Sequence, residues 1–194
     1  MNIGLLGGSF DPVHSGHIYL ANEVVRQTDI EAVWFIPAGK HPFKHRKMEL
    51  PFQDRYALLQ KVIRKYPYFK ALPIDAQEDS PSYTDELIIR LQKHYPDHKF
   101  YFIIGTDLLA ELPRWHNSQW LLENVDFVIV NRPGHAPQQE LLPPKNIIVE
   151  ITPQYVSSTK LRDRIAKNLP IDKFVPEEIE AEVNKLYSKS FLQR

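Results

Sequence analysis

Two glycines, a serine and two histidines stand close together near the N-terminus. Gly7, Gly8 and Ser9 follow a short apolar run, and His14 and His17 come soon after them. Glycine lets the backbone approach a phosphate closely, and the serine hydroxyl can add a hydrogen-bond donor. Side chains three residues apart at the start of a helix lie on the same side of one turn. The segment therefore predicts a phosphate site with two imidazoles beside it.

Other interpretations of this segment use the same residues. The dinucleotide pattern G-x-G-x-x-G does not occur here, and Gly39-Lys40 lacks the hydroxyl residue of a P-loop, so a hydride-transfer enzyme and a P-loop ATPase are both disfavoured. Zinc binding by His14 and His17 would need a third ligand, and the sequence shows no glutamate in the H-E-x-x-H pattern. An ordinary turn with histidine near a helix start is the simplest alternative.

A second group of polar side chains occurs much later in the chain. Ser157, Ser158 and Thr159 precede a helical pattern, and Arg162 lies one turn further along the same face. The first N–H groups of a helix have no partner within the helix, and hydroxyl side chains often accompany them. This group predicts a second anion site with a fixed positive charge. Its simpler alternative is a serine cap followed by a solvated arginine.

Short β-type runs alternate with longer segments of helical period, and this alternation must position both groups. We expect strands at 3–6, 32–36, 71–74, 100–104, 126–130 and 147–151, and helices at 18–28, 52–66, 83–94, 157–168 and 176–188. A helical patch at 108–122 is expected to be interrupted by Pro113, and 132–145 is expected to be an exposed loop. Buried strands separated by helices are typical of a parallel sheet that is covered on both faces. The sequence predicts one doubly wound α/β domain over 1–194, with a C-terminal helical appendage at about 157–190. Ligands of such sheets bind beyond the carboxyl ends of the strands.

The composition excludes several classes of protein. The 194 residues are 43% hydrophobic and 25% charged, as in an ordinary globular domain, and 24 basic side chains balance 24 acidic ones. No sequence-wide positive field exists for nucleic acid or an anionic membrane, so neither is expected as a partner. The absence of cysteine excludes disulfides, thiolate metal sites and thiol nucleophiles. The apolar run at 3–6 is too short for a signal peptide or a membrane span, which favours a cytoplasmic protein.

Both polar groups resemble the signatures of one superfamily. Residues 8–17, GSFDPVHSGH, are similar to the G-[ST]-F-D-P-x-H-x-G-H signature of nucleotidyltransferases, and residues 157–162, SSTKLR, are similar to their S-S-T-x-[IL]-R. The resemblance implies a Rossmann-like fold and the transfer of a nucleotidyl group to a phosphorylated acceptor. It also implies a set of ATP-binding residues: Gly7, Gly8, Ser9, Phe10, Gly105, Asp107, Ser157, Ser158 and Thr159.

The middle of the chain resembles bacterial nicotinate-mononucleotide adenylyltransferases. Residues 81–84, PSYT, and residues 102–115, FIIGTDLLAELPRW, are similar to their S-Y-T and F-I-x-G-x-D-x-L-x-x-L-x-x-W segments, and residues 131–134, NRPG, also fit. This resemblance implies ATP and nicotinate mononucleotide as substrates, nicotinate adenine dinucleotide and pyrophosphate as products, and a place in NAD biosynthesis. A pantetheine-phosphate adenylyltransferase, a cytidylyltransferase and a noncatalytic nucleotide sensor are the alternatives.

The resemblance also assigns roles at the acceptor end. Asp107, together with Gly105, is expected at the nucleotide ribose, and Trp115 at the face of the acceptor's pyridine ring; a helix cap and a core aromatic are the respective alternatives. Backbone amides near Thr84 and His116 are expected to hold the acceptor's carboxylate. The acceptor-binding residues are therefore expected to be Thr84, Trp115, His116 and Arg132.

The catalytic charges and the metal complete the expectation. The resemblance gives His14, His17 and Arg162 to the reacting phosphates. A basic run at 40–47 replaces the family's P-P-H-K segment, and Lys44 is the expected ligand of the acceptor phosphate, with Arg46 or Lys47 as substitutes. Mg²⁺ is expected to enter on the triphosphate of ATP, with no metal ligand from the protein. The sequence is also compatible with a homo-oligomer.

Overall fold

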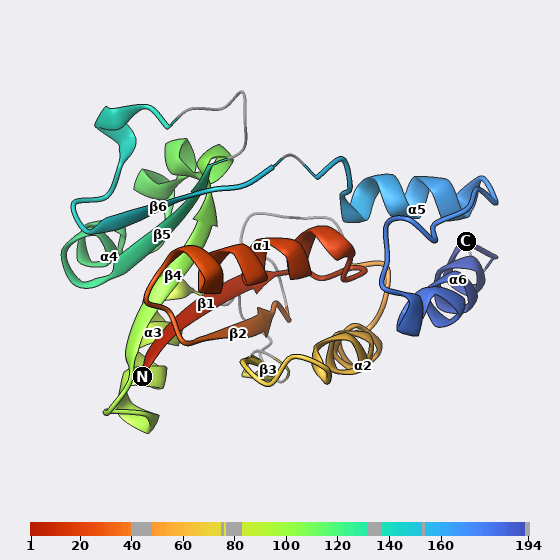
Figure 1. Cartoon of the computed structure of the whole chain (residues 1–194), viewed down its shortest axis with the longest axis horizontal. Helices are drawn as coiled ribbons and strands as arrows, with labels where there is room; N and C mark the ends of the chain where they lie inside the picture. The colour runs from red at the N-terminus through yellow and green to blue at the C-terminus, as the bar shows by residue number, and fades with distance from the viewer. Residues whose placement is uncertain (40–47, 75, 77–82, 132–136, 153, 193–194) are drawn as a thin grey trace.

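The structure is a computed structural model that describes residues 1–39, 48–74, 76, 83–131, 137–152 and 154–192 (Figure 1). Six parallel strands form one sheet in the order β3-β2-β1-β4-β5-β6. Their bounds are β1 Asn2–Gly8, β2 Ala32–Pro37, β3 Phe69–Ala71, β4 Lys99–Gly105, β5 Asp126–Asn131 and β6 Asn146–Glu150. The order reverses between β1 and β4, which are neighbours in the sheet but not in the sequence. The carboxyl ends of β1 and β4 therefore form the switch point where such sheets bind ligands.

Helices connect the strands and cover both faces of the sheet (Figure 1). The α-helices are α1 Ser15–Gln27, α2 Phe52–Ile63, α3 Thr84–His94, α4 Ser118–Asn124, α5 Ser158–Ala166 and α6 Glu177–Leu192, and the 3₁₀ helices are η1 Thr106–Arg114 and η2 Gln139–Leu141. Among the described residues, none of these helices is both long and apolar enough to cross a membrane.

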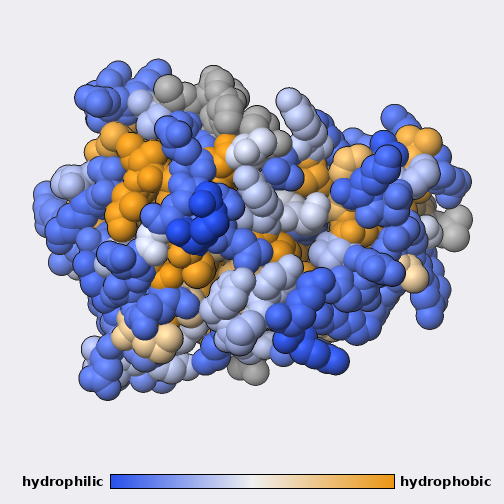
Figure 2. All heavy atoms as spheres, viewed as in Figure 1, coloured by the Kyte–Doolittle hydropathy of each residue, from blue (hydrophilic) through white to orange (hydrophobic). Residues whose placement is uncertain are grey.

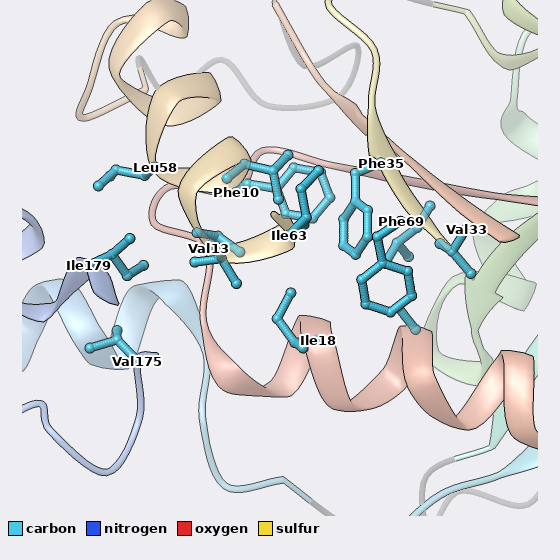
Figure 3. Packing of buried hydrophobic residues seen from close by; sticks show 14 of the residues in the cluster. Phe10, Val13, Ile18, Val33, Phe35, Leu58, Ile63, Phe69, Val175 and Ile179 are labelled. Atoms are coloured by element: carbon cyan, nitrogen blue, oxygen red, sulfur yellow. The ribbon is translucent and has the colours of Figure 1, made fainter. Parts of the chain in front are cut away.

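Two hydrophobic cores lie on opposite faces of the sheet because strand residues alternate between them. Leu6 and Phe35 point into the core formed with α1, α2, α5 and α6, whereas Leu5 and Trp34 point into the core formed with α3, η1 and α4. Figure 3 shows part of the first core between α1 and α2, with Val175 and Ile179 of the C-terminal segment at the left of the view. The predicted doubly wound α/β fold is confirmed. The C-terminal helices are part of the first core, since Leu161 and Val183 are fully buried in it.

Helix α6 packs on α2, far from it in sequence. Lys61 and Lys65 of α2 form ion pairs with Glu182 and Glu178 of α6. These pairs lie at the surface, where such interactions contribute little, so apolar burial is the main cause of the packing.

Three elements differ from the sequence-based expectation. The short strand is Phe69–Ala71, not 71–74, because Pro73 has no N–H for the ladder. The helical patch expected at 108–122, with an interruption at Pro113, consists of η1 and α4. Pro113 lies inside η1, and the break comes after it, where Asn117 adopts a left-handed backbone with φ of 51°. The third is the loop expected at 132–145: it contains η2, while residues 132–136 lie outside the described part of the chain.

Strand β6 is an edge of the sheet, and it keeps apolar side chains at the surface. Ile147 and Ile148 are 37% and 44% exposed. Figure 2 shows a mainly hydrophilic face with hydrophobic patches, one of them in the region of β5 and β6.

Candidate active site

A cavity of about 760 Å³ opens at the carboxyl ends of β1 and β4. It brings together segments from both ends and the middle of the chain. The expected site residues that line it are Gly7, Gly8, Ser9, His14, His17, Thr84, Asp107, Trp115, His116, Ser157, Ser158, Thr159 and Arg162. The two polar groups recognised in the sequence therefore lie at one cavity, as the position of the switch point predicts.

The two histidines lie against each other at the start of α1. Their rings are stacked with centroids 3.6 Å apart and an interplanar angle of 24°. The backbone N–H of His14 donates a 3.2 Å hydrogen bond to Nδ1 of His17. Because Nδ1 of His17 accepts this bond, the proton of the neutral imidazole is on Nε2. The His17 ring is thus fixed in one orientation and one tautomer.

Gly16 is required by this packing. A Cβ atom at position 16 would lie 2.9 Å from Val156 and 3.1 Å from the His14 ring. No side chain fits at these distances without displacing the imidazole, so the glycine permits the close contact of α1 with the segment before α5.

Phe10 anchors the turn between β1 and α1 from the inside. Its ring is 1% exposed, packs 4.9 Å from the His17 ring and 5.7 Å from Phe35, and points into the core (Figure 3). Its backbone is left-handed with φ of 45°, which is rare for a bulky residue. Burial of the ring stabilises this conformation. The side chain does not line the cavity, so contact with a nucleotide would come from the backbone.

Arg55 of α2 is a buried cation that the sequence analysis missed. It is 1% exposed and donates hydrogen bonds to the carbonyl oxygens of Ser9, Ala38 and Leu50. Burial lowers the pKa of the guanidinium, and the nearby Asp11 carboxylate opposes this effect. One side chain therefore holds the backbone after β1, after β2 and before α2 in fixed positions. Its place in an amphipathic helix gave no signal, since arginine is usually solvated.

Asp11 is the second residue that the sequence analysis missed. Its carboxylate is buried and accepts hydrogen bonds from the backbone N–H groups of Glu49 and Leu50, at 2.7 and 3.3 Å, and from the Tyr187 hydroxyl at 2.6 Å. Arg162 donates to the Asp11 carbonyl oxygen and lies 4.0 Å from its carboxylate. Asp11 thus joins the turn after β1 to the residues before α2 and to both C-terminal helices.

The N-terminus of α5 is attached to the same turn. Ser157 caps the helix, because its hydroxyl accepts from the backbone N–H of Lys160 at 3.2 Å. Ser158 donates to the carbonyl oxygen of Pro12 at 2.9 Å, and Arg162 donates to the Thr159 hydroxyl at 3.2 Å. The serine cap is real, but the arginine is only 14% exposed and faces the cavity rather than bulk solvent. A helix N-terminus with an arginine on its first turns is a suitable site for phosphate.

Asp107 lies at the start of η1, against the end of β4. A Cβ atom at position 105 would be 2.3 Å from its carboxylate, so only glycine allows this position of Asp107. Asp107 lines the cavity, whereas Gly105 does not.

The far end of the cavity is aromatic. Trp115 is partly buried, contacts the Phe102 ring edge to face at 5.9 Å and also lines the cavity. The His116 ring stacks on Tyr83 with centroids 4.3 Å apart. Nδ1 of His116 lies 3.0 Å from the buried carboxylate of Asp85, and this hydrogen bond raises the pKa of His116.

Two expected residues cannot be placed. Lys44 and Arg132 lie outside the described residues. Met48 and Glu49, which follow the basic run at 40–47, line the cavity.

The described residues offer no cluster of metal ligands. Within the described segments, no three His, Asp or Glu side chains are grouped to hold an ion. The zinc alternative for His14 and His17 therefore gains no third ligand from that part of the chain.

Comparison with known proteins gives consistent matches. The sequence matches the cytidylyltransferase-like family over residues 5–164. It is 38% identical over 187 residues to a Bacillus licheniformis protein named "Probable nicotinate-nucleotide adenylyltransferase", and the match covers 95% of this chain and 97% of that one. It is 39% identical to a Bacillus cytotoxicus protein of the same name, with the same coverage. The fold is similar to that of Plasmodium falciparum nicotinic acid mononucleotide adenylyltransferase complexed with NaAD, with a TM-score of 0.79 at 21% identity, covering 98% of this chain and 96% of that one.

Proposed function

The chain belongs to the cytidylyltransferase-like family and, within it, to the nicotinate-nucleotide adenylyltransferases, and we propose from this premise that it joins the AMP moiety of ATP to nicotinate mononucleotide. The products are nicotinate adenine dinucleotide and pyrophosphate, and the reaction belongs to NAD biosynthesis. One observation carries the assignment in the structure: two phosphate-type sites, at the starts of α1 and α5, face one cavity whose far end is aromatic.

The reaction is a direct displacement at phosphorus. An oxygen of the acceptor's 5′-phosphate attacks the α-phosphorus of ATP, the bond from the α-phosphorus to its bridging oxygen breaks, and pyrophosphate leaves in line. No protein nucleophile is needed, because the acceptor phosphate already supplies the attacking oxygen. The protein contributes positioning and stabilisation of the charge that grows on the α-phosphate and the leaving group.

The phosphates take positions between α1 and α5. The N–H of His17 and the ring of His14 meet the α-phosphate, where negative charge develops. Arg162 and the free N–H groups at the start of α5 hold the β- and γ-phosphates, which leave as pyrophosphate. The backbone of Gly7, Gly8 and Ser9 lets the nucleotide approach β1 closely. Lys44 is assigned to the acceptor phosphate.

The two nucleosides take the remaining sides of the cavity. Asp107, held against Gly105, accepts hydrogen bonds from the ribose of ATP. Trp115 stacks on the electron-poor pyridine ring of the acceptor, and the backbone near Thr84 and His116 holds its carboxylate. Arg132 is assigned to the same acceptor.

ATP enters as its magnesium complex. Mg²⁺ commonly keeps its waters and binds phosphate oxygens with few protein ligands. The carboxylates that line the cavity, such as Asp107 and Glu111, do not form a group of three within the described chain. The ion therefore belongs to the substrate in this proposal.

The test is a set of parallel reactions with purified protein and Mg-ATP. Nicotinate mononucleotide, nicotinamide mononucleotide and phosphopantetheine are supplied separately, and pyrophosphate and the adenylylated product are measured. We expect fastest release with the first acceptor and no release after chelation of Mg²⁺. Activity only with phosphopantetheine, or no activity with any of the three acceptors, would contradict the assignment.

A further inference from the structure

A buried carboxylate lies directly behind one wall of the acceptor end of the cavity. Asp85 is 3% exposed and does not line the cavity, whereas His116, which contacts it, does. Nδ1 of His116 is 3.0 and 3.1 Å from the two carboxylate oxygens, and the side-chain amide of Asn117 donates to one of them at 3.2 Å. His116 therefore contacts the buried acid and also lines the acceptor end of the cavity.

This contact fixes how the imidazole can meet a ligand. A carboxylate only accepts hydrogen bonds, so the proton of neutral His116 is on Nδ1, and Nε2 is the ring nitrogen that the Asp85 contact does not use. In the neutral ring Nε2 is an acceptor. In the imidazolium it is a charged donor. One protonation step thus reverses the hydrogen-bonding character that the ring presents.

Within the described residues, the charged groups that shift the pKa of His116 are acidic. Asp85 and Glu86 of α3 both raise its pKa, Asp85 through the hydrogen bond most strongly. Asp107 and Glu111 of η1 line the same cavity, and Tyr83 stacks on the ring. Arg114, which ends η1, does not line the cavity, whereas Arg162 lines it. The acidic surroundings favour the imidazolium.

We propose that His116 is a specificity-determining residue, whose imidazolium favours a carboxylate on the acceptor's ring and whose neutral form favours a carboxamide. The inference rests on the proposed function and concerns the same site. The carboxylate of a nicotinate ring accepts a charge-assisted hydrogen bond from the Nε2–H of the imidazolium. The carboxamide of a nicotinamide ring can donate an N–H to neutral Nε2. Asp85 is the positioning residue, because it fixes the ring and its tautomer.

Without His116 the buried Asp85 would work against an acid acceptor. Its negative charge would face the substrate's carboxylate with only the Asn117 amide between, and like charges in a partly desolvated site repel. The histidine removes this repulsion and supplies attraction in its place.

The experiment measures the ratio of kcat/KM for nicotinate mononucleotide to that for nicotinamide mononucleotide between pH 5.5 and 9. The 5′-phosphates of both acceptors also titrate in this range. They act on both acceptors alike, so they cancel in the ratio. We expect the ratio to fall about three- to tenfold as pH rises through the pKa of His116, since the charged form is lost in that direction.

Substitutions identify the group responsible. H116Q keeps an amide donor for Asp85 but does not titrate. Its kcat/KM ratio should therefore be lower than the wild-type ratio at acid pH and should not change with pH. D85N should move the midpoint of the wild-type curve to lower pH. H94Q is the matched control, because His94 is exposed on the same helix α3 and bonds only its own helix at Arg90. It should reproduce the wild-type curve.

A binding measurement gives an independent readout. The NMR titration of the His116 ring should show its pKa rising when nicotinate mononucleotide binds and not when the amide binds, because the coupling between protonation and binding is reciprocal. Two results would overturn this inference and leave the proposed function standing, provided that dinucleotide forms. One is a kcat/KM ratio that does not change with pH in the wild type, and the other is a pH-dependent ratio that persists in H116Q. No dinucleotide from either acceptor at any pH would overturn both.

Discussion

The hydroxyl of Tyr187, in the last helix, donates a 2.6 Å hydrogen bond to the carboxylate of Asp11, which lies 176 positions earlier in the turn between β1 and α1. Both side chains are buried, and Arg162 approaches the same aspartate from α5. The C-terminal helices are thus tied to the turn that carries the candidate catalytic histidines. Their contribution to the site is the position of that turn.

Replacing Tyr187 with phenylalanine should lower stability with little change in packing. The ring remains, but the buried carboxylate of Asp11 loses its hydroxyl donor and keeps only backbone N–H groups and the more distant Arg162. We expect the free energy of unfolding to fall by about 1 to 3 kcal/mol at pH 7. Urea unfolding should show a lower midpoint and an unchanged slope. Tyr155→Phe, at a position that is 82% exposed, is the control and should change nothing. Equal stability of the Tyr187 variant and the wild type would contradict this view of the pair.

Tyr187 should also make the stability of the wild type fall more steeply at alkaline pH than that of Tyr187→Phe. Burial, and then the Asp11 charge, raise the pKa of Tyr187 above its ordinary value of 10.0. The unfolded chain therefore loses this proton first, and stability declines as pH rises above about 10, by about 1.4 kcal/mol per pH unit. The decline should be smaller in Tyr187→Phe, since that variant has no ionisable hydroxyl at position 187. Urea unfolding between pH 9 and 11 measures it, and parallel curves for the two proteins would refute it.

Replacing Arg55 with lysine should lower stability, because lysine keeps the positive charge but loses the several N–H donors of the guanidinium. The guanidinium reaches three separate carbonyl oxygens, and an ammonium on a flexible stem cannot satisfy all three in the same positions. We expect a loss of about 2 to 4 kcal/mol in the free energy of unfolding, because buried carbonyl groups are left without partners. Arg64→Lys, at an exposed position of the same helical segment, should stay within about 0.5 kcal/mol of the wild type. A similar small effect at both positions would show that Arg55 is not needed to hold the loops.

Much of this architecture could be predicted from local patterns. Apolar periodicity located the sheet and most helices, and glycine or hydroxyl residues marked the strand-to-helix turns near Ser9 and Ser157. Since carboxyl ends of parallel strands meet at one edge, these turns were expected to converge, and they do. The information for each of these features lies within a few residues.

The unpredicted features depend on tertiary contacts. Asp11 and Tyr187 are too far apart in sequence for any periodic pattern to pair them, and Arg55 reads as a solvent-facing residue of an amphipathic helix. His116 is expected at the acceptor from the resemblance, but nothing in the sequence pairs it with Asp85, since an acid in the first turn of a helix is ordinary. Only the packing of α3 beside α4 brings them together.

Trp115→Leu should weaken acceptor binding selectively. Leucine keeps the apolar volume against Phe102 but removes the flat π-face that stacks on a pyridine ring. Such stacking is worth about 0.5 to 1.5 kcal/mol, so KM for nicotinate mononucleotide should rise by roughly 2- to 12-fold while KM for ATP is unchanged. Trp120→Leu removes an indole that packs in the same core but does not line the cavity, and it should leave both constants unchanged. If Trp115 acts only in the core, its variant would lose thermal stability and keep its normal KM values.

His17→Ala is the most direct test of the proposed chemistry. The His14 backbone fixes the tautomer of His17, and the proposed function assigns this imidazole to the negative charge that develops on the α-phosphate. Removal of one such preorganised donor typically costs about 100- to 1000-fold in turnover. Because the interaction forms mainly in the transition state, kcat should fall much more than KM changes. Exposed His94→Ala should turn over normally, and circular dichroism should show both variants folded. Normal turnover in His17→Ala would remove this imidazole from the mechanism and leave Arg162 and the helix termini to stabilise the charge alone.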